Sequence, residues 1–116
     1  FFTGHVSFRE LLTLYRLADL YVTMSGHEGF GVPLIESCFM GLPVCALDRG
    51  ATAETLGGAG MLLRETDPMR TALLWNRCLE DEKLRQTLKQ RALERAGEYR
   101  EASQPARLVA LLEEAF

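Results

Sequence analysis

Two carboxylates, Glu28 and Glu36, stand eight positions apart in the segment Glu28-Gly29-Phe30-Gly31-Val32-Pro33-Leu34-Ile35-Glu36. The glycines let the backbone turn and come close to a ligand. Pro33 suits the first position of a helix, so Glu36 would lie about one turn further on, near the positive end of the helix dipole. A carboxylate can accept from two vicinal hydroxyls, and the N–H groups of a first helical turn bind phosphate. This segment therefore predicts a site for a sugar nucleotide.

The length and composition limit what such a site could belong to. The chain has 116 residues, of which 47% are apolar and 25% charged, which is typical of one globular domain. Its longest apolar runs are shorter than the ~18 residues that a membrane span needs. The net charge of -3 does not favour general nucleic-acid binding. Between Arg85 and Arg100 the basic residues alternate with Glu and Gln, which predicts a solvated helix face.

The three cysteines, Cys38, Cys45 and Cys78, have no spacing typical of a metal site and lie in apolar segments. We interpret them as reduced core residues of a cytoplasmic protein.

The first elements that must position the site are a strand, a helix and a second strand. The segment Phe1–Val6 is expected to be a strand. Ser7 and Glu10 have the spacing of a capping box, which predicts a helix that begins at Ser7. Its expected buried stripe consists of Leu11, Leu14, Tyr15 and Ala18. The apolar run Leu20–Met24 predicts a buried parallel strand, and the carboxylate turn follows its carboxyl end.

The next segments continue this alternation. The helix that opens at Pro33 is expected to end at Gly41 and Pro43. Strands are then predicted at Pro43–Leu47 and Met61–Leu63, with a short helical turn at Ala53–Leu56 between them.

The remainder of the chain is expected to be helical. Asp67 and Pro68 predict a helix start, Asp81 begins a second helix through Gly97, and Ser103 begins a third. The first of these helices carries Met69, Ala72, Leu73, Trp75 and Leu79, and the third carries Leu108, Leu111 and Leu112. The order predicts the α/β class: part of a Rossmann-like, doubly wound parallel sheet with a helical C-terminal tail. Ligands of such sheets bind at the carboxyl ends of the strands.

The pattern Glu28-Gly-Phe-Gly-x-Pro-x-x-Glu36 is followed by Gly41-x-Pro43-Val44, Gly50-Ala51-x-x-Glu54 and Gly58-x-Gly60. Together these motifs resemble the C-terminal, donor-binding half of a retaining family 4 glycosyltransferase (glycosyl transferases group 1) with the GT-B fold. The resemblance extends from about Phe2 to the C-terminus. It implies that residues 1–116 are a single nucleotide-sugar-binding domain and a fragment of a longer hexosyltransferase-type enzyme. Such an enzyme moves a sugar from a nucleotide diphosphate sugar to an acceptor glycan or lipid, as in polysaccharide biosynthesis.

The resemblance also implies roles for particular residues. Glu28 corresponds to the catalytic glutamate beside the donor sugar, and Glu36 to the glutamate that binds the ribose hydroxyls. The remaining donor-binding residues are Gly29, Phe30, Gly31, Val32 and Leu34. No metal and no cofactor beyond the nucleotide-sugar substrate is expected. In the family a basic Arg and Lys pair neutralises the diphosphate from a loop that would precede Phe1, and Arg49 does not match it.

Several partners follow from the same resemblance. The acceptor would be held by an N-terminal domain that these residues do not include, so the 116-residue chain alone is expected to be inactive. The parent enzyme is expected in the cytoplasm, with its other domain in contact with the inner face of the membrane. An uncovered strand edge would favour self-association, and no nucleic-acid partner is expected.

Other interpretations remain open from the sequence. Glu36 could be an ordinary glutamate favoured by a helix dipole, and Glu28 a polar loop residue. His27 and Glu54 have no assigned role. The chain could also be a non-catalytic binding or scaffolding module. An epimerase-type Rossmann domain is disfavoured because the sequence contains no G-x-G-x-x-G fingerprint.

Overall fold

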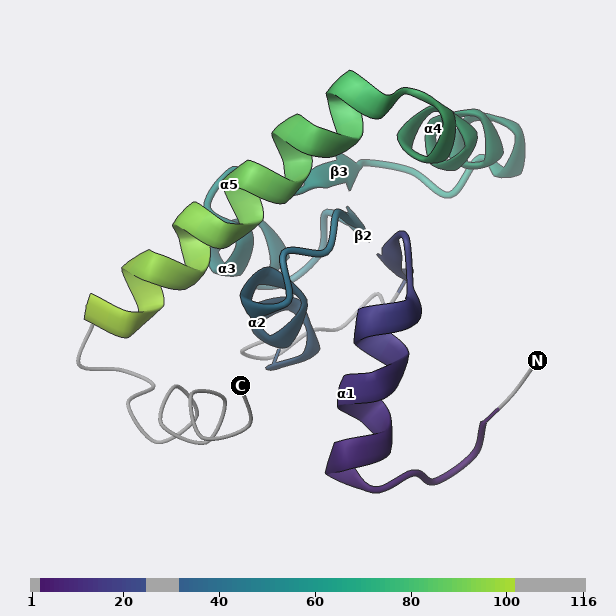
Figure 1. Ribbon diagram of the computed structural model, residues 1–116. Helices are drawn as coiled ribbons and strands as arrows, with labels where there is room; N and C mark the ends of the chain where they lie inside the picture. The colour runs from purple at the N-terminus through teal and green to yellow at the C-terminus, as the bar shows by residue number, and fades with distance from the viewer. Residues whose placement is uncertain (1–2, 25–31, 102–116) are drawn as a thin grey trace.

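The computed structural model describes residues 3–24 and 32–101, and Figure 1 shows the path of the chain. Its elements are α1 (Phe8–Leu17), β1 (Tyr21–Thr23), α2 (Val32–Phe39), β2 (Val44–Leu47), α3 (Thr52–Leu56), β3 (Met61–Leu63), α4 (Pro68–Glu80) and α5 (Glu82–Glu101). Strands and helices alternate until β3, and two helices follow. This confirms the predicted α/β class, with a partial Rossmann-like sheet and a helical C-terminal region.

The sheet is parallel and has the order β1-β2-β3, with Val22 paired to Cys45 and Ala46 paired to Leu62. All four residues of β2 are buried because β2 lies between the other two strands. The strand expected at Phe1–Val6 is wrong for residues 3–6, which form no strand. Gly4 has a φ of 65°, a left-handed conformation that interrupts an extended backbone.

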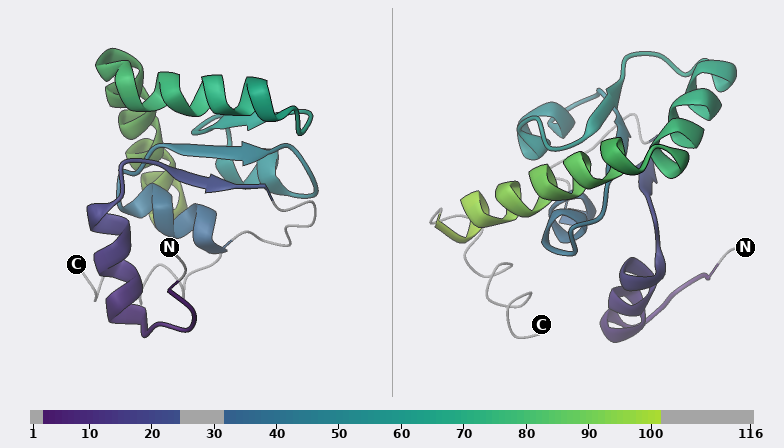
Figure 2. Two further views of the ribbon diagram at one scale, coloured as in Figure 1. Left: turned by 90° about the vertical axis from the view of Figure 1, so that its right-hand side faces the viewer. Right: turned by 45° about the horizontal axis from the view of Figure 1, so that its top comes forward.

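The two faces of the sheet are covered by different helices. The left view of Figure 2 shows α4 on one face and α2 on the other. On the α2 side, the apolar core joins β2 to α2, α3 and α5; it consists of Leu34, Ile35, Cys38, Phe39, Val44, Ala46, Leu56, Ala59, Ala92, Ala96 and Tyr99. On the other side of β2, the Cys78 thiol of α4 donates a weak hydrogen bond to the Met61 sulfur, 3.1 Å away. All three cysteines are buried and reduced, as predicted.

Helix α1 begins with the predicted capping box. The Ser7 hydroxyl accepts from the Glu10 N–H at 3.2 Å, and a Glu10 carboxylate oxygen accepts from the Ser7 N–H at 2.8 Å. Its buried residues are Leu12 and Tyr15, whereas Leu14 and Ala18, which were expected to be buried, are exposed. Figure 1 shows α1 extending away from the other helices, so that only a narrow side of α1 is covered.

Helix α2 ends where the sequence predicts. Gly41 follows it with a φ of 64°, and its N–H donates to the Cys38 carbonyl. The next N–H, of Leu42, donates to the Ser37 carbonyl. These bonds satisfy carbonyls at the helix end and turn the chain into β2.

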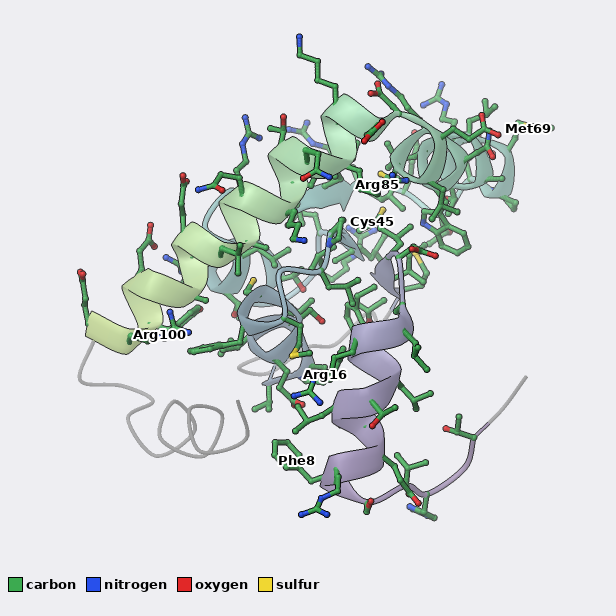
Figure 3. All side chains as sticks on the ribbon, in the orientation of Figure 1. Phe8, Arg16, Cys45, Met69, Arg85 and Arg100 are labelled. Atoms are coloured by element: carbon green, nitrogen blue, oxygen red, sulfur yellow. The ribbon has the colours of Figure 1, made fainter. Side chains whose placement is uncertain are left out.

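Helix α4 begins at its predicted cap, because an Asp67 carboxylate oxygen accepts from the Met69 N–H at 3.0 Å. Most of the apolar residues that the sequence places on this helix lie outside the core. Met69 and Leu73 are 68% and 63% exposed, Ala72 and Leu79 are also exposed, and Thr71 and Cys78 are buried instead. Figure 3 shows Met69 pointing away from the protein. A threonine and a cysteine contribute weakly to an apolar pattern, so the apolar spacing of this segment does not indicate which side of the helix is buried.

Helix α5 begins at Glu82, directly after Asp81, whose carboxylate accepts from the Leu84 N–H. It continues past Gly97, the predicted end, to Glu101. A glycine inside a helix costs only about 1 kcal/mol relative to alanine, and the packing of Ala92, Ala96 and Tyr99 on the core outweighs that cost. The helix predicted from Ser103 lies outside the described residues. Within residues 3–24 and 32–101, no helix is both long and apolar enough to cross a membrane.

Candidate functional site

The predicted site lies at the carboxyl ends of β1 and β2. Strand β1 ends at Thr23, and α2 begins at Val32. The predicted residues Glu28, Gly29, Phe30 and Gly31, with the neighbouring His27, fall between them and lie outside the described residues. The roles assigned to these residues therefore stay predictions. The described part of the site consists of α2 and the loop after β2.

Glu36 is the fifth residue of α2 and is only 6% exposed. Its Oε2 atom is buried and has no hydrogen-bond partner among the described residues. Burial raises the pKa of this carboxyl above its ordinary value of 4.5. An unsatisfied buried acceptor costs about 1–3 kcal/mol, and a charged one costs more. The structure thus holds a strong acceptor out of water, where hydroxyl donors from a ligand would stabilise it.

Tyr15 brings α1 into the surroundings of Glu36. Its ring lies against that of Tyr21, with centroids 6.1 Å apart. Burial raises the pKa of the Tyr15 hydroxyl far above its ordinary value, and the charge of Glu36 raises it further. Tyr15 therefore stays neutral, and it lies near enough to Glu36 for the charge of that carboxylate to act on its hydroxyl. The sequence predicted that Tyr15 is buried but contained no indication that it lies near Glu36, because this proximity depends on how α1 packs against α2.

The other described site residues, Val32 and Leu34, lie in the first turn of α2. Leu34 and Ile35 are fully buried in the core, whereas Val32 is partly exposed. The N–H groups of these three residues have no acceptor within α2, since the first four N–H groups of a helix never do. Pro33 has no N–H to contribute. The core therefore fixes a helix start whose N–H groups and dipole favour an anion.

The loop at the carboxyl end of β2 lies between Leu47 and α3. Its first residue, Asp48, donates its N–H to the Leu63 carbonyl at 2.7 Å. The buried Thr52 hydroxyl donates to the Arg49 carbonyl at 2.8 Å. Because β1 and β2 are adjacent and parallel, this loop and the start of α2 lie at the same edge of the sheet.

The Arg49 guanidinium donates to the carbonyl of Asp48, its neighbour in the chain. Glu54, whose role the sequence left open, is exposed on α3. The described residues contain no cluster of three or more His, Cys, Asp or Glu side chains that could hold a metal ion. The site that they form is a buried acceptor beside a helix start and a well-bonded loop.

Comparison with known proteins gives the chain a family context. The family model for glycosyl transferases group 1 matches residues 1–95. The D-inositol 3-phosphate glycosyltransferase of Thermobispora bispora is 34% identical over 109 residues, which are 92% of this chain and 26% of that protein. The O-antigen chain mannosyltransferase B of Escherichia coli is 29% identical over 98 residues, which are 84% of this chain and 26% of that protein.

The serotype-specific mannosyltransferase WbdA of Escherichia coli is also 29% identical over 98 residues, which make up 12% of its length. The chain thus spans about a quarter or less of these relatives.

Proposed function

The chain belongs to the glycosyl transferases group 1 family, and from that membership we propose that it is the donor-binding part of a retaining family 4 enzyme. That enzyme transfers a hexosyl group from a nucleotide diphosphate sugar to an acceptor glycan or lipid. Residues 1–116 form one domain of this protein, and the acceptor binds to another. The relatives named for mannosyl transfer and for inositol phosphate glycosylation support sugar transfer as the reaction class.

The observation that carries this proposal is the burial of Glu36 with an unpartnered carboxylate oxygen. A ribose presents two adjacent hydroxyl groups, and one carboxylate can accept from both. Hydrogen bonds to a charged group contribute about 1.5–3 kcal/mol, more than neutral ones. Binding a ribose at Glu36 would therefore relieve the cost of burying this group. A glutamate needed only for the helix dipole would gain nothing from burial.

The start of α2 would face the diphosphate, through the N–H groups of Val32 and Leu34 and of the preceding Gly29, Phe30 and Gly31. Glu28 would lie beside the donor sugar. A helix dipole contributes only about 0.3–2 kcal/mol to binding an anion, whereas catalysis needs a barrier lowered by at least ~8 kcal/mol. Further positive charge must therefore come from the parent enzyme. We expect no metal requirement, and no sugar transfer by the 116-residue chain alone.

Titration of the chain with UDP, GDP and ADP, followed by NMR amide shifts, tests the donor site. We expect shifts around the start of α2 and an affinity that falls roughly 10- to 100-fold in Glu36→Gln, because two charge-assisted bonds become weaker. Glu94→Gln, an exposed position on α5, is the matched control and should bind like the parent chain. Equal affinity in all three proteins, or no binding at millimolar nucleotide, would contradict the proposal.

A further inference from the structure

Helix α3 has only five residues. Side chains of another helix, α5, donate hydrogen bonds to carbonyl groups near its carboxyl end. The last four carbonyls of a helix have no partner within it. In α3, the carbonyls of Ala53 and Leu56 accept from backbone N–H groups just beyond the helix. The carbonyls of Glu54 and Thr55 accept instead from side chains of α5, 40 or more residues further along the chain.

Arg95 supplies most of these bonds. Its Nη2 donates to the Glu54 carbonyl at 2.8 Å and its Nε to the Thr55 carbonyl at 3.0 Å. The Tyr99 hydroxyl donates to the same Thr55 carbonyl at 2.6 Å. The guanidinium also pairs with Glu98 and lies 4.8 Å from the centre of the Tyr99 ring. The sequence had predicted a solvated helix face between Arg85 and Arg100. The Arg95 side chain is only 21% exposed, so this prediction is wrong for Arg95.

The chain makes room for this guanidinium at Gly57. This residue has a φ of 54°, and a Cβ placed on it would lie 2.6 Å from the Arg95 Cζ. The next residue, Gly58, also has a positive φ, of 86°, but a Cβ there would meet nothing within 4 Å. A side chain at Gly57 would therefore displace Arg95, whereas one at Gly58 would only strain the backbone.

The other end of α3 is bonded to the loop at the candidate site. Thr52, the first residue of α3, is fully buried, and both its N–H and its hydroxyl donate to the Arg49 carbonyl. A five-residue helix is too short to be stable alone. The position of the loop 48–51 thus depends on α3, and the position of α3 depends on α5. Figure 1 shows α5 crossing the molecule past α2 and α3, where it can hold both.

We propose that Arg95, assisted by Tyr99, is a positioning residue that holds α3 and the loop 48–51 in the conformation that binds the nucleotide donor. The binding part of this inference rests on the proposed function. Arg95 does not touch the ligand in this arrangement. It acts through the Glu54 and Thr55 carbonyls and then through Thr52 and Arg49.

Amide hydrogen exchange of the 116-residue chain tests the positioning without any ligand. In Arg95→Gln we expect the amides of Thr55 and Gly57 to exchange at least about tenfold faster, because α3 opens locally, while the amide of Ala46 in β2 changes less than about threefold. Arg91 is an exposed arginine one turn earlier in α5. Arg91→Gln removes the same charge and is the matched control, and it should change amide exchange neither in α3 nor in β2. Equal acceleration throughout the protein, or none, would overturn the inference.

The two glycines provide an independent pair of variants. Gly57→Ala should reproduce the exchange pattern of Arg95→Gln, because it displaces the guanidinium. Gly58→Ala also places an alanine at a positive φ but should leave α3 protected relative to β2. The same pattern in both alanine variants would mean that strain, and not the displacement of Arg95, releases the helix.

Nucleotide titration then tests the link to the site. We expect the affinity for the preferred nucleotide among UDP, GDP and ADP to fall roughly fivefold or more in Arg95→Gln and to stay unchanged in Arg91→Gln, within the usual range of coupling between sites. Faster α3 exchange with unchanged affinity would overturn the role of this loop in binding. Absence of binding in the parent chain would instead contradict the proposed function, while the exchange result would still decide whether Arg95 holds α3.

Discussion

Glu36 is a residue whose burial opposes folding, because its carboxylate lacks a partner for Oε2 among the described residues and its pKa is raised. Such a group is expected where a site has been favoured over stability. Replacement of Glu36 should therefore change stability and binding in opposite directions.

We predict that Glu36→Gln raises the free energy of unfolding at neutral pH by about 1 kcal/mol, since a buried neutral amide costs less than a buried charge. A raised pKa means that the folded protein binds this proton more tightly than the unfolded chain. The stability that Glu36 contributes is thus complete below its unfolded pKa and is lost as the pH rises through its folded pKa. The difference in free energy of unfolding between Glu36→Gln and the parent chain should accordingly vanish below about pH 4.

Urea unfolding at pH 4 and pH 7 measures this difference, with Glu94→Gln as the control. A parent chain that is more stable than Glu36→Gln at neutral pH would show that Glu36 is partnered within the protein and is not held ready for a ligand.

Among the elements, α5 shows how packing overrides a local signal. Its helix continues through Gly97, and a Cβ at that position would meet nothing within 4 Å. Gly97→Ala should therefore raise the free energy of unfolding by about 0.5–1 kcal/mol, because alanine loses less backbone entropy and no atom must move. Gly58→Ala should lower it, since Gly58 has a positive φ. A midpoint of thermal unfolding that shifts in the same direction for both variants would contradict these opposite predictions.

The elements that sequence predicted well have their signals within a few residues. Ser7 with Glu10, Asp67 and Gly41 correctly marked helix ends, and the three strands of the sheet were found at their apolar runs. The strand expected at Phe1–Val6 fails for a local reason, the left-handed conformation of Gly4, whereas the other errors concern contacts between distant segments. The rotation of α4 depends on what the sheet presents to it, and the inward position of Arg95 depends on carbonyls of α3.

For the candidate site too, the sequence predicted the local features but not the packing between segments. The spacing from Pro33 indicated where Glu36 would lie on a helix, but its burial and the nearby Tyr15 depend on the packing of α1 and α2. Four of the predicted site residues, Glu28 to Gly31, lie outside the described residues and keep their predicted roles.

At the scale of the whole molecule, each outer strand of the described sheet has a partner on one side only. In the described sheet β1 and β3 each pair with β2 as their neighbouring strand, and Val22 in β1 and Leu62 in β3 are each 37% exposed. Exposed edges of this kind favour pairing with another chain. We predict concentration-dependent self-association, which Val22→Lys should weaken if β1 forms the contact and Leu62→Lys if β3 does. Sedimentation equilibrium measures it, and a parent chain that stays monomeric at high concentration would contradict the prediction.

The most direct test of the donor site is the pKa of the Glu36 carboxyl, followed through its ¹³Cδ shift in a pH titration with and without nucleotide. If ribose hydroxyls bind this group, they stabilise its charged form, and the raised pKa should fall when UDP, GDP or ADP is bound but not when pyrophosphate is. An unchanged pKa with saturating nucleotide, or an equal fall with pyrophosphate, would contradict the assignment of Glu36 to the ribose.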